Sequence, residues 1–288
     1  MAKNKRKRQV LVLGAGGKVG RMLARAWQKH PSDWWLPIYQ TGGAPFGSAI
    51  EWHPEDAPDL LPGVDAILAL WGVTNSRAGD LADNTRLALR ALELAGQLGA
   101  QRVLLCSSSA VYARSDKKHT ERDAPAAPPT AYGQAKLNME RAVADWAARN
   151  PDGPEICILR MANVVGAESL FAALASGAPV TLDRFADGTG PARSYLTIGD
   201  LSRFVLALLD YPAPDLPPLL NVAGDHAIAM ADLARAAGAD IVWKAAPDKA
   251  VQRVELDTGQ LSKIAGPSHS SHDADRAIAD WRSWRSRA

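Results

Sequence analysis

The stretch V-L-V-L-G-A-G-G-K-V-G, residues 10–20, decides the fold of the first half of the chain. Four apolar residues run directly into a glycine-rich loop, and residues 17–29 then place their apolar side chains at helical spacing. The loop repeats its glycines as G-x-x-G-x-x-G. Such glycines permit a tight turn, a close backbone approach to a pyrophosphate and close helix packing, while the helix N-terminus supplies N–H donors. The stretch predicts a dinucleotide site formed by Gly14, Gly17, Lys18, Val19 and Gly20.

Short apolar runs alternate with helical stretches through the first half of the chain. The run at residues 64–70 has no polar alternation after Asp65, which is typical of a strand covered on both faces. This alternation predicts an α/β fold with a parallel sheet and right-handed crossovers. We expect strands at residues 9–13, 34–39, 64–70, 102–106 and 156–160, and helices at residues 17–29, 81–98 and 130–149.

The pattern changes after Gly166. Segments become shorter, and residues 211–218 contain four prolines, which indicates a linker or boundary. Helical spacing returns in three later stretches, at residues 201–210, 229–237 and 275–284, and Trp281 and Trp284 are expected to dock the last of them. We therefore expect a dinucleotide-binding domain at residues 1–165 and a smaller substrate-binding lobe at residues 166–288, with residues 198–210 packing back on the first domain.

Composition excludes several classes of protein. Of the 288 residues, 47% are hydrophobic and 22% charged, which excludes a disordered or fibrous chain. Five of the 33 basic residues lie in the first eight positions, so the remainder, with 28 basic and 31 acidic residues, is mildly acidic and ill-suited to nucleic acid. No apolar run approaches a membrane span, and the first is too short for a signal peptide. We expect Cys106 and Cys157 to be buried thiols, which are typical of a reducing compartment. We therefore expect a cytoplasmic protein.

Tyr132 and Lys136 lie four residues apart in a predicted helix, and therefore on one helix face. An unperturbed tyrosine has a pKa of about 10. To act as a base near neutral pH, Tyr132 needs its pKa lowered by about three, which corresponds to roughly 4 kcal/mol. The lysine ammonium and an oxidised nicotinamide could together supply it. We interpret the pair as catalytic, because it follows a dinucleotide loop and a serine-ended strand; the alternative is a surface pair.

The end of the second predicted strand bears on cofactor choice. An acidic residue is expected there to bind a ribose 2′-hydroxyl, but the chain has Gln40, followed by Thr41. An amide can bind that hydroxyl without repelling a 2′-phosphate, and no arginine stands there to attract the phosphate. The cofactor is therefore NAD or NADP, with a slight preference for NAD.

Several motifs together resemble the extended short-chain dehydrogenase/reductases, the NAD-dependent epimerase/dehydratase group. Besides the glycine loop and the Tyr132–Lys136 pair, residues 107–112 read S-S-S-A-V-Y, and Asn84 matches the family's asparagine segment. Three further stretches are similar to the family patterns LRxxNVxG, RxxxxVxDL and DxSKxxxxLG, at residues 159–166, 193–201 and 257–266. The matches cover nearly the whole chain in the family's order.

The resemblance implies a doubly wound parallel Rossmann sheet with a smaller C-terminal substrate lobe. It implies that Tyr132 is the general acid/base and that Lys136 binds the ribose and lowers the pKa of the phenol. It also implies that Ser108 binds the substrate hydroxyl, with Ser109 as the second choice. Arg193 lies where relatives bind a diphosphate; the alternative is a surface arginine paired with Asp187 or Asp200. The remaining residues that we expect near cofactor or substrate are Leu70, Trp71, Gly72 and Asn163.

These observations lead to three hypotheses about function. The first is an NAD(P)-dependent epimerase/dehydratase-type oxidoreductase acting on a secondary alcohol of a nucleotide sugar or similar polyol. Ser109 and Ala110 stand where dehydratases of the group carry acidic residues, which favours an epimerase or reductase. The second is an NADP-dependent reductase of a small carbonyl compound. The third is a non-catalytic dinucleotide sensor, which would not need Ser108, Tyr132 and Lys136.

We expect a small-molecule substrate and no nucleic-acid or membrane partner. A homodimer would form through the helices at residues 81–98 and 132–149. No metal site is expected, because His269 and His272 have no third ligand near in sequence. Asn84 could also simply cap a helix, and Asp65 is expected to be a strand-start residue rather than a catalyst.

Overall fold

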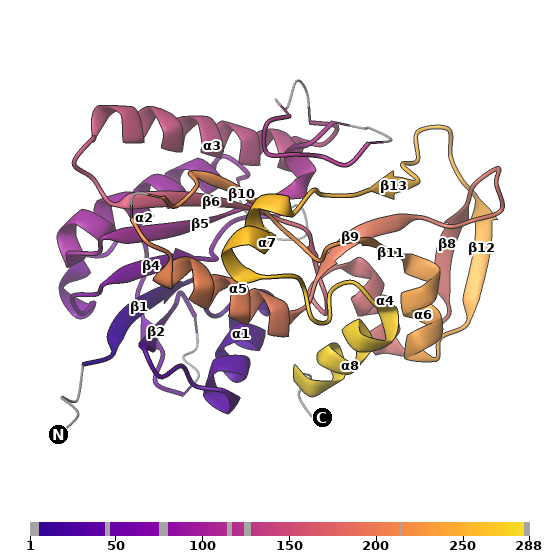
Figure 1. Cartoon of the computed structure of the whole chain (residues 1–288), viewed down its shortest axis with the longest axis horizontal. Coiled ribbons are helices and arrows are strands. Elements are labelled where there is room, and N and C mark those ends of the chain that lie inside the picture. Colours follow the sequence, from indigo (N-terminus) through magenta and orange to yellow (C-terminus); the bar gives the residue numbers. More distant parts are fainter. Residues whose placement is uncertain are drawn as a thin grey trace. The chain divides into compact units, whose positions relative to one another are not determined.

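The computed structural model describes residues 6–43, 47–74, 80–113, 117–123, 128–213 and 215–284 (Figure 1). The chain divides into two compact units, each built from three stretches. Unit 1 contains Met1–Ser107, Thr130–Leu159 and Leu208–Pro218, and unit 2 contains Ser108–Pro129, Arg160–Ala207 and Leu219–Ala288. The units are interleaved along the chain, whereas the sequence suggests one boundary at residue 165.

A seven-stranded sheet has the strand order β10-β6-β5-β4-β1-β2-β3. Its central pairs, from β5 through β4, β1 and β2 to β3, are parallel, as the sequence predicts. The chain leaves β1 toward β2 on one side and reaches β4 on the other, so the crevice at their carboxyl ends is a topological switch point, where such sheets bind ligands. The bounds are β1 Arg8–Leu13, β2 Trp35–Thr41, β3 Ile50–Glu51, β4 Ala66–Ala69, β5 Arg102–Ser108, β6 Glu155–Met161 and β10 Leu219–Val222.

Apolar composition explains the central strands. In β1 the last four residues are completely buried, and all of β4 is buried, which confirms that both strands are covered on both faces. Asp65 accepts a hydrogen bond from the Gln9 N–H at 2.6 Å and so acts at the start of a strand, as predicted. The short strand β3 was not predicted, because two residues carry no alternation signal.

The helices of unit 1 are α1 (Lys18–Lys29), α2 (Asp83–Leu98) and α3 (Ala131–Arg149), with a short 3-10 helix η1 (Pro58–Leu60). Helices α2 and α3 contact each other on one side of the sheet, and α1 lies on the other (Figure 1). Gly99, with φ +78°, ends α2 in a left-handed conformation that favours glycine. All three helices lie within two residues of their predicted bounds.

Unit 2 contains two smaller sheets and the C-terminal helices. Strands β7 (Asn163–Val164), β9 (Ala192–Leu196), β11 (Ala227–Ala229) and β13 (Arg253–Val254) form one sheet, and β8 (Val180–Arg184) pairs with β12 (Ile241–Ala245). The helices and one 3-10 turn are η2 (Ser109–Val111), α4 (Ser169–Ser176), α5 (Ile198–Asp210), α6 (Met230–Ala237), α7 (Gly259–Ala265) and α8 (Ala274–Trp284). Helix α5 crosses the division between units at residue 207.

The core of unit 2 is aromatic at its centre. The Phe171 ring meets the rings of Tyr195 and Trp281 edge-on, with centroids 6.3 and 4.9 Å apart. Trp281 and Trp284 are both buried, which confirms that they dock the last helix. Across the described ranges, no helix combines the length and apolar character that crossing a membrane requires.

Candidate active site

The glycine loop of unit 1 is shaped by contacts that exclude side chains. Gly14 has φ +77°, and a Cβ there would lie 2.6 Å from the Trp71 Cα. A Cβ on Gly20 would lie 2.6 Å from the Ala15 Cα, so α1 can approach the loop only at a glycine. Because Gly17 at the N-cap has no side chain, no side-chain oxygen of its own caps the first-turn N–H groups of α1. The loop therefore offers a cradle that fits a pyrophosphate.

Gly72, just beyond β4, lies beside two polar side chains. A Cβ at this position would lie 2.8 Å from Asn84 Oδ1 and 3.2 Å from Lys136 Nζ. The buried Asn84 amide donates to the carbonyls of Val73 and Leu81, each at 3.0 Å, and so ties the loop after β4 to the start of α2. The N-cap of α2 is Ala82, so Asn84 is not a simple helix cap.

Lys136 is anchored at the end of β5. Its side chain is buried, and Nζ donates to the Cys106 carbonyl at 2.9 Å. Burial lowers the pKa of Lys136, while negative charge at Cys106 and Glu140 acts to raise it. Glu140, one turn further along α3, is also buried and accepts a hydrogen bond from the Ser107 hydroxyl. This bond between Ser107 and Glu140 holds α3 against β5.

Tyr132 lies in the first turn of α3, on the same helix face as Lys136 and half-buried. The turn is fixed by Thr130, whose hydroxyl accepts a hydrogen bond from the Gly133 N–H at 3.0 Å. This N-cap sets the direction of α3 at the tyrosine. Unit 1 thus brings together the glycine loop, Gly72, Asn84, Lys136 and Glu140.

Gln40 differs from its predicted role. Its side chain is 2% exposed; Oε1 accepts from the Gly14 N–H at 2.8 Å, and Nε2 donates to the Trp52 carbonyl. The amide therefore fastens the glycine loop to the segment after β3. Thr41, the next residue, is also buried.

The predicted residues of unit 2 are held by backbone contacts. The half-buried Ser108 hydroxyl accepts from the Ala110 N–H at 3.2 Å, which leaves its own proton for another acceptor. Ser109 begins η2 and is half-buried too. Asn163 begins β7, whose pairing places it opposite Tyr195 of β9.

Arg193 is neither a surface residue nor a partner of Asp187 or Asp200. Its guanidinium donates to three backbone carbonyls, those of Ala192, Val251 and Gln252, at 2.6–2.9 Å. Burial lowers its pKa. A guanidinium has five N–H donors, and these bonds use three of them.

A polar group that the sequence analysis missed lies near Arg193. The Tyr195 hydroxyl and Oε1 of Glu168 are both buried, and Oε1 of Glu168 has no hydrogen-bond partner among the described residues. Burial raises the pKa of the Glu168 carboxyl, which caps α4 through the Leu170 N–H. The signal available in the sequence was the position of Glu168, two residues beyond the end of the matched motif at residues 159–166.

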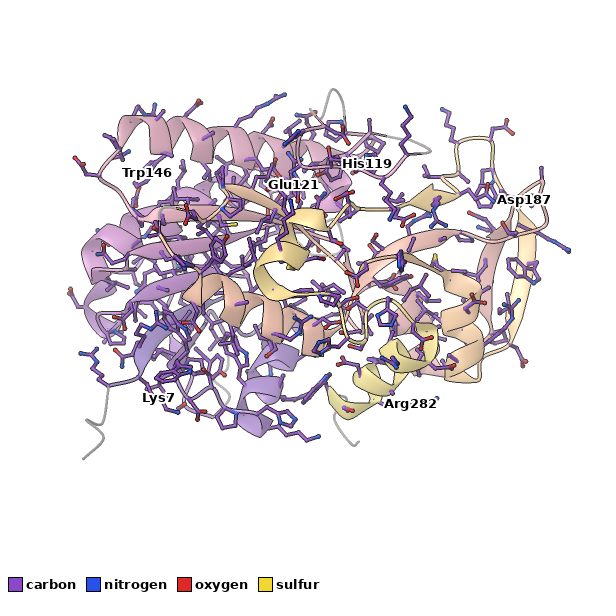
Figure 2. The ribbon with its side chains drawn as sticks, in the orientation of Figure 1. Lys7, His119, Glu121, Trp146, Asp187 and Arg282 are labelled. Carbon is purple, nitrogen blue, oxygen red and sulfur yellow. The ribbon has the colours of Figure 1, made fainter. Side chains whose placement is uncertain are left out.

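A second buried network surrounds Tyr112. Its hydroxyl donates a hydrogen bond to Asn221 Oδ1 at 2.7 Å and accepts one from Arg160. Its ring stacks on the His119 ring, with the two centroids 4.6 Å apart. The Asn221 N–H also donates a hydrogen bond to the Glu121 carboxylate. Figure 2 labels His119 and Glu121, which lie on the same short segment. Burial raises the pKa of Tyr112, so this phenol remains protonated and serves structure.

The residues of unit 1 fit a dinucleotide on two observations. The glycine cradle excludes side chains, and the buried Nε1 of Trp71 lacks a protein acceptor among the described residues. In those same parts of the chain, no group of three His, Cys, Asp or Glu side chains is arranged to hold a metal ion.

Comparison with known proteins agrees with this geometry. The model of the NAD dependent epimerase/dehydratase family matches residues 10–223. No curated protein sequence matches the chain. MoeE5 in complex with UDP-glucuronic acid and NAD is 21% identical, with a TM-score of 0.77 over 96% of this chain and 98% of MoeE5. The UDP-Glc/GlcNAc 4-epimerase of Campylobacter jejuni is 19% identical, with a TM-score of 0.79 over 96% of this chain and 98% of its own. At these identities the likeness establishes the fold.

Proposed function

Because the chain belongs to the NAD dependent epimerase/dehydratase family, we propose that it uses NAD to oxidise and re-form a secondary alcohol of a nucleotide sugar or similar polyol, as an epimerase. The observation that carries this proposal is the buried Lys136 beside Gly72, on the same helix face as Tyr132. An ammonium group is costly to bury, and a phenolate formed nearby offsets that cost. The pair is therefore suited to holding Tyr132 deprotonated.

Each residue has a distinct task in this mechanism. A bound NAD would supply the hydride acceptor for oxidation of the alcohol carbon and, as NADH, the hydride donor that re-forms the alcohol. Tyr132 takes the hydroxyl proton and returns it when the alcohol re-forms, while Lys136 stabilises the phenolate. Glu140 and Asn84 position Lys136 and the loop after β4, and the Ser108 hydroxyl would donate a hydrogen bond to the substrate oxygen.

The ligands of the compared structures support the finer assignments. MoeE5 was solved with NAD and a UDP-sugar, and so was the UDP-glucuronic acid 4-epimerase of Bacillus cereus. We take NAD as the cofactor and a nucleoside diphosphate sugar as the leading substrate class. The two remaining donors of Arg193 would then hold a diphosphate oxygen.

One observation favours the reductase of a small carbonyl compound as a second candidate. Three donors of Arg193 are committed to carbonyls, and the Glu168 carboxylate interacts electrostatically with the same guanidinium. A carboxylate near the arginine weakens its attraction for a second anion. A substrate without a phosphate would not meet this repulsion.

An isotope experiment separates the two candidates. A nucleotide sugar deuterated at the reacting carbon should return the label to its epimer with no added reductant. A reductase would form no epimer from this sugar and would consume added NADPH only when a small carbonyl compound is supplied as its substrate. Tyr132→Phe should lose at least about 100-fold in turnover, the low end of general acid–base contributions, while retaining NAD binding. Turnover close to that of the wild type would contradict the assignment of Tyr132.

We also propose a homodimer through α2 and α3. A mostly apolar groove of about 720 Å³ runs between them, lined by Leu81, Ala82, Thr85, Arg86, Leu89, Ala131, Gln134, Ala135 and Asn138. The twofold packing of two such grooves would bury this surface.

A further inference from the structure

Trp71 carries a buried indole N–H that no described residue accepts. Buried donors in folded proteins almost always have a partner, and an unpaired one is costly. This tryptophan directly follows Leu70 at the end of β4, where the crevice between β1 and β4 opens. An unpaired donor at that point indicates a position for a ligand acceptor.

One side of Trp71 lies against the glycine loop. Its backbone N and Cα are each 2.6 Å from the place that a Cβ of Gly14 would occupy. Because Gly14 is the first glycine of the cradle, the backbone and Cβ of Trp71 lie against the loop that would hold the phosphates. Trp71 therefore borders the dinucleotide site.

The other side of Trp71 lies against Trp52, which follows β3. The two rings stack with centroids 6.4 Å apart and planes 26° apart. Trp52 is fully buried, its Nε1 donates to the Ala57 carbonyl at 2.8 Å, and the Arg90 guanidinium lies 5.7 Å from its ring. Trp52 is thus a fixed support that holds the Trp71 ring on the β2–β3 side of the crevice.

This side of the crevice is opposite to Lys136. Lys136 is bonded at the end of β5, whereas Trp52 follows β3, at the far edge of the sheet. In a sheet of this type the residue at the end of β2 binds the adenosine ribose, so the β2–β3 side receives the adenosine half. Gln40, which stands at that position, already bonds the Gly14 N–H and the Trp52 carbonyl through its amide.

We propose that the Trp71 indole N–H donates a hydrogen bond to the adenosine half of the bound dinucleotide, and that the Trp71–Trp52 pair replaces the acidic residue missing at the end of β2. The proposal rests on the proposed binding of NAD. It makes Trp71 a determinant of cofactor affinity.

The test uses the full chain with ¹⁵N-labelled indole groups. The chain has nine tryptophans, so nine indole N–H resonances are expected, and the one absent in Trp71→Phe belongs to Trp71. Contacts to the Trp52 ring provide a second assignment in the wild type. Adding ADP-ribose should shift this resonance, whereas adding nicotinamide mononucleotide should leave it in place.

Calorimetric titration gives the corresponding affinities. Trp71→Phe keeps a ring against Trp52 but removes the donor, so NAD and ADP-ribose should each bind about two- to twelve-fold more weakly, the range for one hydrogen bond. Nicotinamide mononucleotide should bind as it does to the wild type. Trp146→Phe is the matched control, because Trp146 lies near the C-terminal end of α3, as Figure 2 shows.

The outcomes separate this inference from the proposed function. Two results would overturn this inference and leave the proposed function standing, provided that the wild type binds NAD. One is a Trp71 resonance that does not shift when ADP-ribose is added. The other is a Trp71→Phe variant that binds ADP-ribose as tightly as the wild type does. If Trp71→Ala binds ADP-ribose more tightly, the ring obstructs the site and the inference is also overturned. If the wild type binds no dinucleotide, the proposed function fails first.

Discussion

Replacing Asp200 by asparagine should cost about 2.5 kcal/mol of folding stability at pH 7. Asp200 is 1% exposed, and its carboxylate accepts hydrogen bonds from the N–H groups of His269, Ser270 and Ser271 at 2.9 Å and from the Ser271 hydroxyl at 2.7 Å. Burial alone would raise the pKa of Asp200; the hydrogen bonds outweigh it and lower the pKa from 3.8 to about 2.

The magnitude follows from that decrease. A pKa difference of one corresponds to roughly 1.4 kcal/mol, so the carboxylate of Asp200 contributes about 2.5 kcal/mol once it is ionised in both states. Because the folded pKa is the lower one, this contribution is complete above about pH 4 and is lost as the pH falls toward 2. A neutral asparagine imitates the protonated acid, so wild type and variant should converge in stability near pH 2.

Urea denaturation of both proteins between pH 2 and pH 7 measures this difference directly. Subtracting the two curves removes the titration of other carboxylates that the proteins share. Asp232→Asn is the matched control, because Asp232 is exposed and its ion pair among the described residues is with Arg235, one turn away, an interaction worth less than about 0.5 kcal/mol. A difference between wild type and Asp200→Asn that stays constant with pH would refute the hydrogen-bonding argument.

Three further substitutions test the site and the assembly. Gln40→Asp should lower the free energy of unfolding by about 1–3 kcal/mol, because the Trp52 carbonyl loses its hydrogen-bond donor. The ratio of NAD to NADP affinities should stay unchanged. Titrations with both cofactors measure that ratio, and a shift toward NAD would show that residue 40 contacts the ribose. Arg193→Ala should weaken binding of uridine diphosphate by about ten- to 150-fold in calorimetry, and equal binding would favour the small-carbonyl reductase. Leu89→Glu should convert a dimer into monomers in sedimentation experiments, and an unchanged mass would remove the α2–α3 groove from the interface.

Local patterns predicted the elements that carry the site. The glycine loop, the strand before it and the helix after it are adjacent in sequence, so their order and spacing suffice to predict them. The shared face of Tyr132 and Lys136 follows from helical geometry alone, and Glu140, one turn beyond Lys136, could have been found by the same spacing. The buried docking of Trp281 and Trp284 likewise follows from their separation by three residues.

What the sequence by itself determined was therefore periodic or contiguous: an α/β chain, a parallel sheet that opens with a glycine loop, and a tyrosine–lysine face on α3. Only the tertiary structure decided which partners the polar side chains take. Gln40 meets Gly14 and Trp52, which lie 26 and 12 residues away, and Arg193 meets carbonyls 58 and 59 residues away. A residue type states which hydrogen bonds a side chain can make, whereas the folded path of the chain decides which acceptor lies within about 3 Å.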